Sequence, residues 1–182
     1  MQEYYEEQKL NLMWMWLISI GAFFAVGYGL FQQVVLGQPL GSNPAPDAVL
    51  WTIACLILGI LLTMAMTILK TRISKEGISI RYRPFGSEKI FWSEVESFSI
   101  QKPDVKGVGV RSSPLSRFKY YNTHIGDMLI LKLKNGRKVG VGTKRAAELR
   151  DFLHNLIAEK GNGDLLRDLQ ENRERIELKN RR

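Results

Sequence analysis

Two groups of basic residues are the side chains in this sequence whose types and spacing suit binding an anion. The first group is Lys75 with Arg81 and Arg83. Two cations on one face of a strand, together with a lysine in the preceding turn, could hold a phosphate group. The simpler interpretation is a solvated or membrane-facing strand, since Glu76 sits in the same turn and the chain is rich in basic residues.

The second group of basic residues lies in the longest loop region and consists of Arg111, Arg117 and Lys119. Two tyrosines follow it directly, and glycines at 107 and 109 would let backbone N–H groups approach an anion. Long loops in compact domains are often functional, so this is where we expect a specific ligand if there is one. The interpretation we prefer is structural: the glycines form a turn, and Arg111 pairs with a carboxylate of the sheet.

Residue patterns for catalysis or metal binding are not found. The two histidines, His124 and His154, have no cysteine or Ser-Asp arrangement beside them, and the single cysteine, Cys55, lies in an apolar run. No phosphate-binding loop that ends in Gly-Lys-Ser/Thr is present. We therefore expect no enzyme, no metal site and no cofactor.

Two long apolar runs come before these basic groups and must position them. Residues 12–35 and 48–69 contain no charge, and each is long enough for a helix that crosses a hydrocarbon core of about 30 Å. The acidic start of the chain argues against a cleaved signal peptide, whose first region is basic. We expect residues 1–69 to form a transmembrane hairpin.

The connector between the two runs, residues 37–47, predicts the orientation of the hairpin. It holds three prolines and no Lys or Arg, so the chain should turn there and lie outside the cell. Both termini are then expected in the cytosol.

Small residues at four-residue spacing predict how the helices pack. They are Gly21, Ala25 and Gly29 in the first run, and Cys55, Gly59 and Thr63 in the second. This spacing places each set on one helix face and allows backbones to approach closely. We expect the two helices to pack together through these faces, with dimerisation of two copies as the alternative.

The remainder of the chain is strongly basic. Of the 26 Lys and Arg, 25 follow residue 69, as do 14 of the 18 Asp and Glu, which gives this part a net charge of +11. Such a surface tied to a bilayer is attracted to anionic headgroups. The plainer alternative is that the charge only satisfies the positive-inside rule.

Alternating apolar residues from residue 70 onward predict a β-rich domain over 70–160. Strands are expected near 71–74, 78–83, 89–92, 96–102, 118–123, 129–133 and 137–141, with a short one near 108–111 and a single helical turn at 93–96. Asn135-Gly136 favours a type I′ hairpin. Apolar residues spaced by three and four from Ala146 to Ile157 predict a helix that covers an open end of the sheet, with Thr143 as its cap. Residues 161–182 should form a charged helical or disordered tail.

The order of these elements resembles a pleckstrin-homology-like (PH-like) fold, an α+β sandwich or barrel of about seven strands capped by a C-terminal helix. The segments TRISKEGISIRYRPFGSEKIFWSEVESFSIQ, GVGVR, KYYN and NGRKVGVGTKRAAEL resemble uncharacterised bacterial membrane proteins that pair two spans with such a domain. The resemblance covers about residues 1–158 and implies the bacterial cytoplasmic membrane but no established activity. By letter, Lys75, Arg81 and Arg83 also match the loose pattern with which some eukaryotic PH domains hold phosphoinositides.

These observations together predict a non-enzymatic, membrane-anchored module that binds anionic lipid, a protein partner or both at the cytosolic face. The alternative is an accessory subunit of a larger membrane complex that docks through its hairpin. Nucleic acid is not an expected partner, because the basic domain has neither aromatic residues interleaved on exposed strands nor a recognition-helix pattern.

Overall fold

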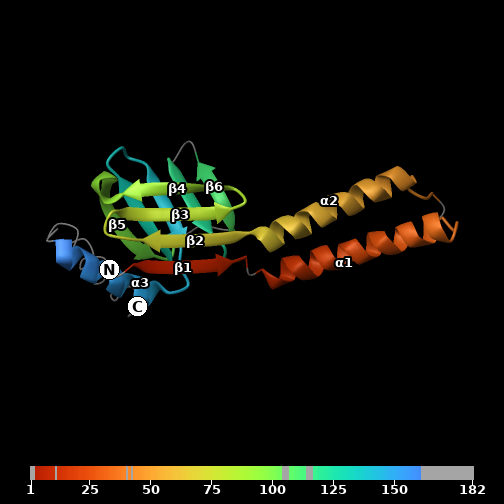
Figure 1. Ribbon diagram of the computed structural model, residues 1–182. Coiled ribbons are helices and arrows are strands. Elements are labelled where there is room, and N and C mark those ends of the chain that lie inside the picture. Colours follow the sequence, from red (N-terminus) through yellow and green to blue (C-terminus); the bar gives the residue numbers. More distant parts are fainter. Residues whose placement is uncertain are drawn as a thin grey trace, which may run out of the picture. The chain divides into compact units, whose positions relative to one another are not determined.

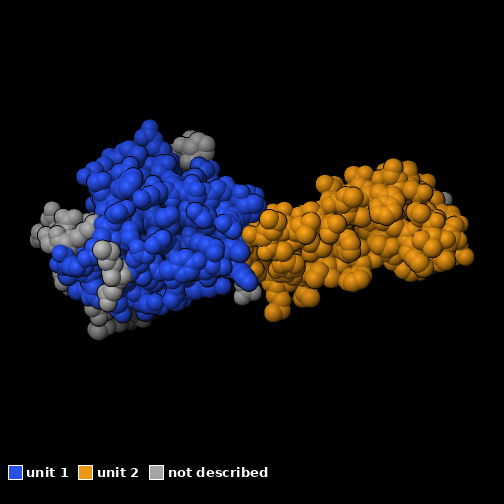
Figure 2. All heavy atoms as spheres, viewed as in Figure 1, with its two compact units in different colours: residues 1–9, 68–182 blue, residues 10–67 orange. Residues whose placement is uncertain are grey.

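The computed structural model describes residues 3–10, 12–39, 41, 43–103, 107–113 and 117–160 (Figure 1). The chain divides into two compact units, one of residues Leu10–Thr67 and one of Met1–Lys9 with Ile68–Arg182 (Figure 2). We refer to them as the helical unit and the β unit. The predicted tail at 161–182 lies outside the described residues.

The helical unit consists of two antiparallel apolar helices. They are α1 (Met13–Leu30), which continues as a π-helix, η1 (Phe31–Val35), and α2 (Asp47–Met66). Both are long and apolar enough to cross a membrane, with mean hydropathies of 1.6 and 2.4. Only 11% and 6% of the most apolar stretch of the first and second helix is buried, whereas the core helix of a soluble protein is mostly buried. The first run ends as predicted, but α2 stops at Met66, because Ile68 and Leu69 belong to a strand and not to the helix.

The β unit contains nine strands in its described residues, arranged as two sheets. The first sheet has the order β1-β2-β3-β4, from strands Tyr4–Lys9, Ile68–Ile73, Gly77–Arg83 and Gly86–Phe91. The second has the order β5-β8-β9-β7-β6, from strands Val95–Gln101, Met128–Leu133, Lys138–Gly142, Phe118–Asn122 and Gly109–Ser113. A 3₁₀ turn, η2 (Trp92–Glu94), joins the sheets close to the predicted helical turn. Neither sheet closes into a barrel.

Strand β1 is the element that the sequence analysis placed wrongly. Residues Tyr4–Lys9 do not belong to the membrane hairpin but pair antiparallel with β2, from Tyr4 opposite Ile73 to Lys9 opposite Ile68. Side chains 4, 6 and 8 are buried and 5, 7 and 9 are exposed, as expected for an edge strand with one face on a core. In the chain, the helical unit is therefore an insertion between β1 and β2, which pair with each other. The boundaries of the β unit lie after Lys9 and before Ile68, instead of a single boundary after residue 69.

The hairpin of β8 and β9 forms at the expected residues with a different turn. Only Gly136 has a positive φ, of 78°, whereas a type I′ turn needs positive φ at both central residues. Leu133 accepts a hydrogen bond from the Gly136 N–H at 2.8 Å, and the Asn135 side chain accepts one from the Arg137 N–H at 2.9 Å. The connection is thus a three-residue loop with glycine in the left-handed position.

Helix α3 (Ala146–Lys160) packs its apolar face on the core that the two sheets enclose. Its contacts include the Phe152 ring, which lies 5.7 Å from the ring of Tyr4 on β1. The core residues on α3 are those predicted from the helical spacing, namely Leu149, Leu153, Leu156 and Ile157. In Figure 1, α3 lies along the β1 side of the unit. Two sheets and three α-helices in the described residues together confirm the predicted α+β class.

Candidate functional site

The exposed face of the first sheet gathers six basic side chains from all four strands. Directly opposite residues in a sheet share a face, and the pairing places Lys70 beside Arg81, Arg72 beside Ser79 and Lys89, and Lys9 in the row of Ile68 and Arg83. The inward positions of β1, β2 and β3 are buried; most are apolar, and Glu6, Gln8 and Thr71 are the polar ones. We call this surface the basic face, and its cations are Lys9, Lys70, Arg72, Arg81, Arg83 and Lys89.

Three cations of the basic face are paired with carboxylates. Lys70 lies 2.8 Å from Glu7, Arg72 lies 2.6 Å from Glu3, and Lys89 lies 3.4 Å from Glu76. The hydrogen bond from Lys70 lowers the pKa of the Glu7 carboxyl and raises that of the lysine. Within the described ranges, Lys9, Arg81 and Arg83 make no ion pair.

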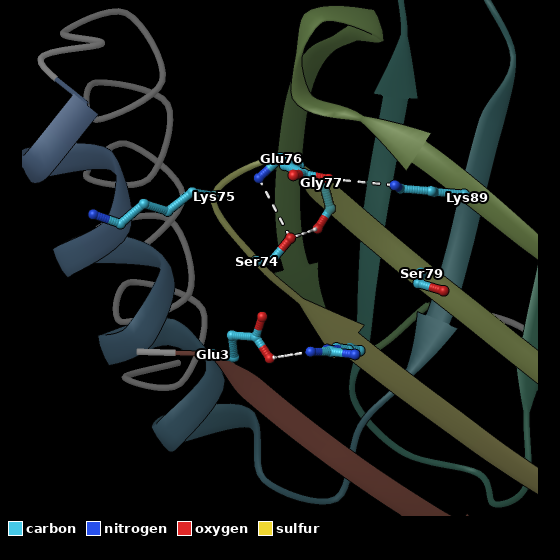
Figure 3. A pocket seen from close by; sticks show the side chains of 8 residues that line it. Glu3, Ser74, Lys75, Glu76, Gly77, Ser79 and Lys89 are labelled. Carbon is cyan, nitrogen blue, oxygen red and sulfur yellow. Dashed lines mark hydrogen bonds and ion pairs between the residues drawn. The ribbon is translucent and has the colours of Figure 1, made fainter. Parts of the chain in front are cut away.

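A cavity of about 550 Å³ lies at the end of the basic face marked by the β2–β3 turn (Figure 3). Its lining includes Arg72 and Lys89, which are paired as above, and Lys75, whose side chain points toward α3 and pairs there with Glu159. The Ser74 hydroxyl donates to the Gly77 carbonyl at 3.4 Å and accepts from the Glu76 N–H at 3.3 Å. Each cation of this cavity therefore already has a carboxylate partner, with which an anion would have to compete.

The structure does not bring the first predicted group together. Arg81 and Arg83 share the basic face, as predicted, but Lys75 precedes β3 and lies at the opposite end of that strand from Arg83. Gly77 and Arg83 are the two ends of β3, six residue steps apart, which corresponds to about 20 Å. A single phosphate cannot contact all three side chains.

The second predicted group is divided between the two faces of its sheet. Arg111 lies opposite Tyr120 on the neighbouring strand, so it shares the face of Tyr120, whereas Lys119 points to the other face. Arg117 directly precedes β7 and has a positive φ of 48°. Arg111 packs against Gly107, where an added Cβ would lie 3.3 Å from its guanidinium.

Lys119 belongs to a charge cluster around Glu88 that joins the two sheets. Glu88 points inward from the edge strand β4 and accepts from Lys119 at 3.2 Å, from the Tyr121 hydroxyl at 2.6 Å and from Arg137. Burial acts to raise the pKa of Glu88, but the bonds from Tyr121 and Lys119 and the charge of Arg137 outweigh it, so the pKa is lowered. We infer a structural role, with Lys119 committed to this carboxylate.

A second polar cluster, centred on Glu6, was missed by the sequence analysis. Glu6 is 3% exposed, and its carboxylate accepts four hydrogen bonds, from Tyr4 Oη at 2.7 Å, Thr143 Oγ1 at 2.7 Å, the Lys144 N–H at 2.8 Å and Gln8 Nε2 at 2.9 Å. The Gln8 side chain also donates to the Gly142 carbonyl at 2.8 Å and accepts from Thr123 Oγ1 at 2.8 Å. This network fixes β1 to the end of β9. The residues YYEEQK do not alternate between apolar and polar types, so the sequence carried no local signal for this network.

Thr143, the predicted helix cap, is part of this network. Its hydroxyl accepts from the Arg145 N–H at 3.1 Å while donating to Glu6. It therefore orders the turn before α3 instead of capping a helical N–H. Nearby, burial lowers the pKa of the His124 imidazole, and the charge of Lys144 acts in the same direction.

The small residues predicted to pack α1 against α2 lie mostly elsewhere. An added Cβ at Gly21 or Gly59 meets no atom within 4 Å, and of the six residues only Gly29 is buried. The Thr63 hydroxyl bonds the Gly59 carbonyl of its own helix at 2.8 Å. The less exposed positions of α2 are Leu50, Ala54, Ile57, Leu61, Thr63 and Met64, so of the three predicted residues on this helix only Thr63 is among them.

The described part of the chain contains no group of three His, Cys, Asp or Glu side chains able to hold a metal ion. Its basic face can attract anions but offers no acid–base pair directed at a bound molecule. No protein-family model matches this sequence, and comparison with curated proteins finds no match either. The resemblance to PH-like membrane proteins therefore stays a prediction.

Proposed function

We propose that this protein is a membrane-anchored module whose β unit binds anionic lipid headgroups through the basic face. One observation carries the proposal: the two apolar helices are inserted between β1 and β2, the strands that hold half of the basic cations. Three of the cations, Lys9, Arg81 and Arg83, make no ion pair in the described residues, so the face is left with uncompensated positive charge.

Chain connectivity supports a lipid surface as the binding partner. Four peptide steps lead from Lys9 to Met13, where α1 begins, and they span at most about 14 Å. Two steps lead from Met66 to Ile68, at most about 7 Å. If both helices cross a bilayer, the end of the first sheet at Lys9, Ile68 and Arg83 is held close to its surface.

The electrostatic attraction is of useful size at such a distance. A lysine or arginine near an anionic leaflet contributes about 1 kcal/mol, so three unpaired cations contribute on the order of 3 kcal/mol. This attraction falls off over about 8–10 Å at physiological salt. Cations of the face that come within that range of an anionic leaflet then favour orientations of the β unit that turn the face toward it.

The same proposal assigns the β unit to the cytosol as a PH-like domain without enzymatic activity, in the cytoplasmic membrane of a bacterium. The lysine-free and arginine-free connector supports this orientation. Two sheets around one core with a C-terminal helix against their open side support the fold.

The test uses the full chain, extracted from its membrane in polymer nanodiscs that retain lipid. We expect phosphatidylglycerol to be enriched in these discs relative to the bulk membrane, and the enrichment to decline as salt is raised before extraction. Arg81→Glu with Arg83→Glu should abolish it. The matched control, Lys134→Glu with Lys138→Glu, makes the same charge change on the second sheet and should retain it. Equal lipid composition in all discs contradicts the proposal.

A second function, an accessory subunit that docks through its helices, is favoured by one observation. The small-residue face of α2 around Cys55, Gly59 and Thr63 lines a shallow open groove that no residue of α1 contributes to. Crosslinking from Cys55 in native membranes tests it, since partners trapped within the bilayer support the subunit and their absence supports the lipid-binding module.

A further inference from the structure

We infer that two loop tips at one end of the β unit, carrying Phe85 and Ile125, insert into the headgroup layer of the bilayer that α1 and α2 cross. This inference rests on the proposed function and makes it more specific. It names apolar anchors for the interface in addition to the cations of the basic face.

Both tips lie at the end of the β unit where the chain enters the helices. Strand β3 ends at Arg83, in register with Ile68 and Lys9, and Phe85 follows in the β3–β4 turn. Figure 1 shows the arrowheads of β1 and β3 at the same end of their sheet.

The second sheet places its own loop at this same end. The Tyr82 hydroxyl on β3 donates to the carbonyl of Asn122, the last residue of β7, at 3.4 Å. The Thr123 hydroxyl donates to Gln8 on β1 at 2.8 Å. Ile125 follows two residues later, in the segment that leads into β8.

The two tip residues are exposed although they are large and apolar. Phe85 is 61% exposed and Ile125 is 65% exposed; among the described residues of the β unit, the other exposed large apolar side chains are Tyr5 at 50% and Phe91 at 45%. Scattered apolar residues on a protein surface need no explanation. Two such residues at loop tips, at the end of the β unit where the chain connects to the membrane-length helices, suit the bilayer interface, where side chains with apolar bodies are stabilised.

Cations accompany the tips, as binding to an anionic interface requires. Arg83 precedes the turn that carries Phe85, and Lys9 lies two strands away at the same level of the sheet, since both are opposite Ile68. Lys102 follows Gln101, the last residue of β5, which is opposite Met128 at the start of β8. These three side chains are exposed and have no ion pair in the described part of the chain. The exposed carboxylates near them in the described residues include Asp127 and also Glu7, with which Lys9 interacts electrostatically. The combination of apolar tips with surrounding cations fits anionic phospholipid.

The experiment measures the depth of labelled sites in the full chain, reconstituted in nanodiscs with and without phosphatidylglycerol. In a Cys55→Ser background, an environment-sensitive dye is attached to Ser87→Cys, two residues from Phe85. Ser93→Cys is the matched control, because it is an exposed serine at the other end of β4. Doxyl-labelled lipid reports contact with the bilayer, and iodide reports contact with water.

We expect lipid quenching and iodide protection at position 87 in anionic discs, and the reverse at position 93. Phe85→Ser with Ile125→Ser should abolish the lipid quenching at 87, whereas Phe91→Ser, which removes an exposed ring from the far end, should not. An unchanged thermal midpoint shows that the double variant is folded, since both tips are exposed.

Two results overturn the inference. If position 87 is as accessible to iodide as position 93, the tips stay in water; protection from both quenchers instead shows that a protein covers them. In either case, retained phosphatidylglycerol enrichment leaves the proposed function standing, whereas loss of both signals removes it as well.

Discussion

Replacing Glu6 by alanine should weaken the β unit severely, because this carboxylate is buried and accepts four hydrogen bonds. The Lys144 N–H cannot turn away, and the hydroxyls of Tyr4 and Thr143 are enclosed with it. A buried donor left without its partner costs about 1–3 kcal/mol, and removing this carboxylate leaves several enclosed donors unpaired at once. A loss of about 3–5 kcal/mol is a large share of the roughly 5–15 kcal/mol that stabilises a domain.

The control for this prediction is Glu7→Ala on the same strand. Glu7 is exposed and pairs with Lys70 on the basic face, so removing it should change stability little. The two variants differ by one position in sequence and by the face of β1 on which the side chain lies.

Hydrogen exchange of the full chain in nanodiscs, read by mass spectrometry, measures the difference. Peptides that cover β1 and the β9–α3 junction should exchange more than about a hundredfold faster in Glu6→Ala, since every 1.4 kcal/mol is a factor of ten. Peptides from α1 and α2 should be unaffected. Equal exchange in the two variants would show that β1 is not part of the folded β unit.

Three further outcomes follow from the structure. The pKa of Glu88 lies below its ordinary value of 4.5, so its contribution to stability is present above pH 4.5 and is lost as the pH falls through the folded pKa. Calorimetry should find Glu88→Gln less stable than the unmodified protein at pH 7, and its thermal midpoint should fall less as the pH is lowered. Midpoints that fall equally with pH in both proteins would contradict the role of the cluster. Gly77→Ala would place Cβ 2.2 Å from the Ile90 carbonyl oxygen and should cost about 1–3 kcal/mol, whereas Ser79→Ala two residues on should be nearly neutral in urea unfolding. In a Cys55→Ser background, an impermeant maleimide added to intact cells should label Asn43→Cys and not Ser87→Cys, and the opposite pattern would invert the proposed topology.

The apolar helices and most strands could be predicted because their signals are local. The run from Ala48 onward is apolar over its whole length, and Leu129, Leu131 and Leu133 alternate with Ile130, Lys132 and Lys134. Such patterns depend only on which residues lie next to each other along the chain. The end of α2 was placed three residues too late because Ile68 and Leu69 are apolar in a helix and in a buried strand alike.

The candidate site could be predicted only in part, because strand pairing decides which cations meet. Arg81 and Arg83 share a face by simple alternation within one strand. Lys119 carries the same charge, yet its face is turned toward Glu88, on a strand some thirty residues earlier in the chain. No local pattern identifies that carboxylate as its partner.

The sequence alone was sufficient to place two membrane-length helices, a basic β-rich part and its C-terminal helix, because hydropathy and period are properties of neighbouring residues. Only the tertiary structure decided that Tyr4–Lys9 is a strand of the β unit, that Glu6 is buried in it, and that the helices are inserted between two paired strands. The physical reason is that these features depend on pairing between residues 59 to 69 positions apart, and the energy of that pairing has no trace in either segment by itself.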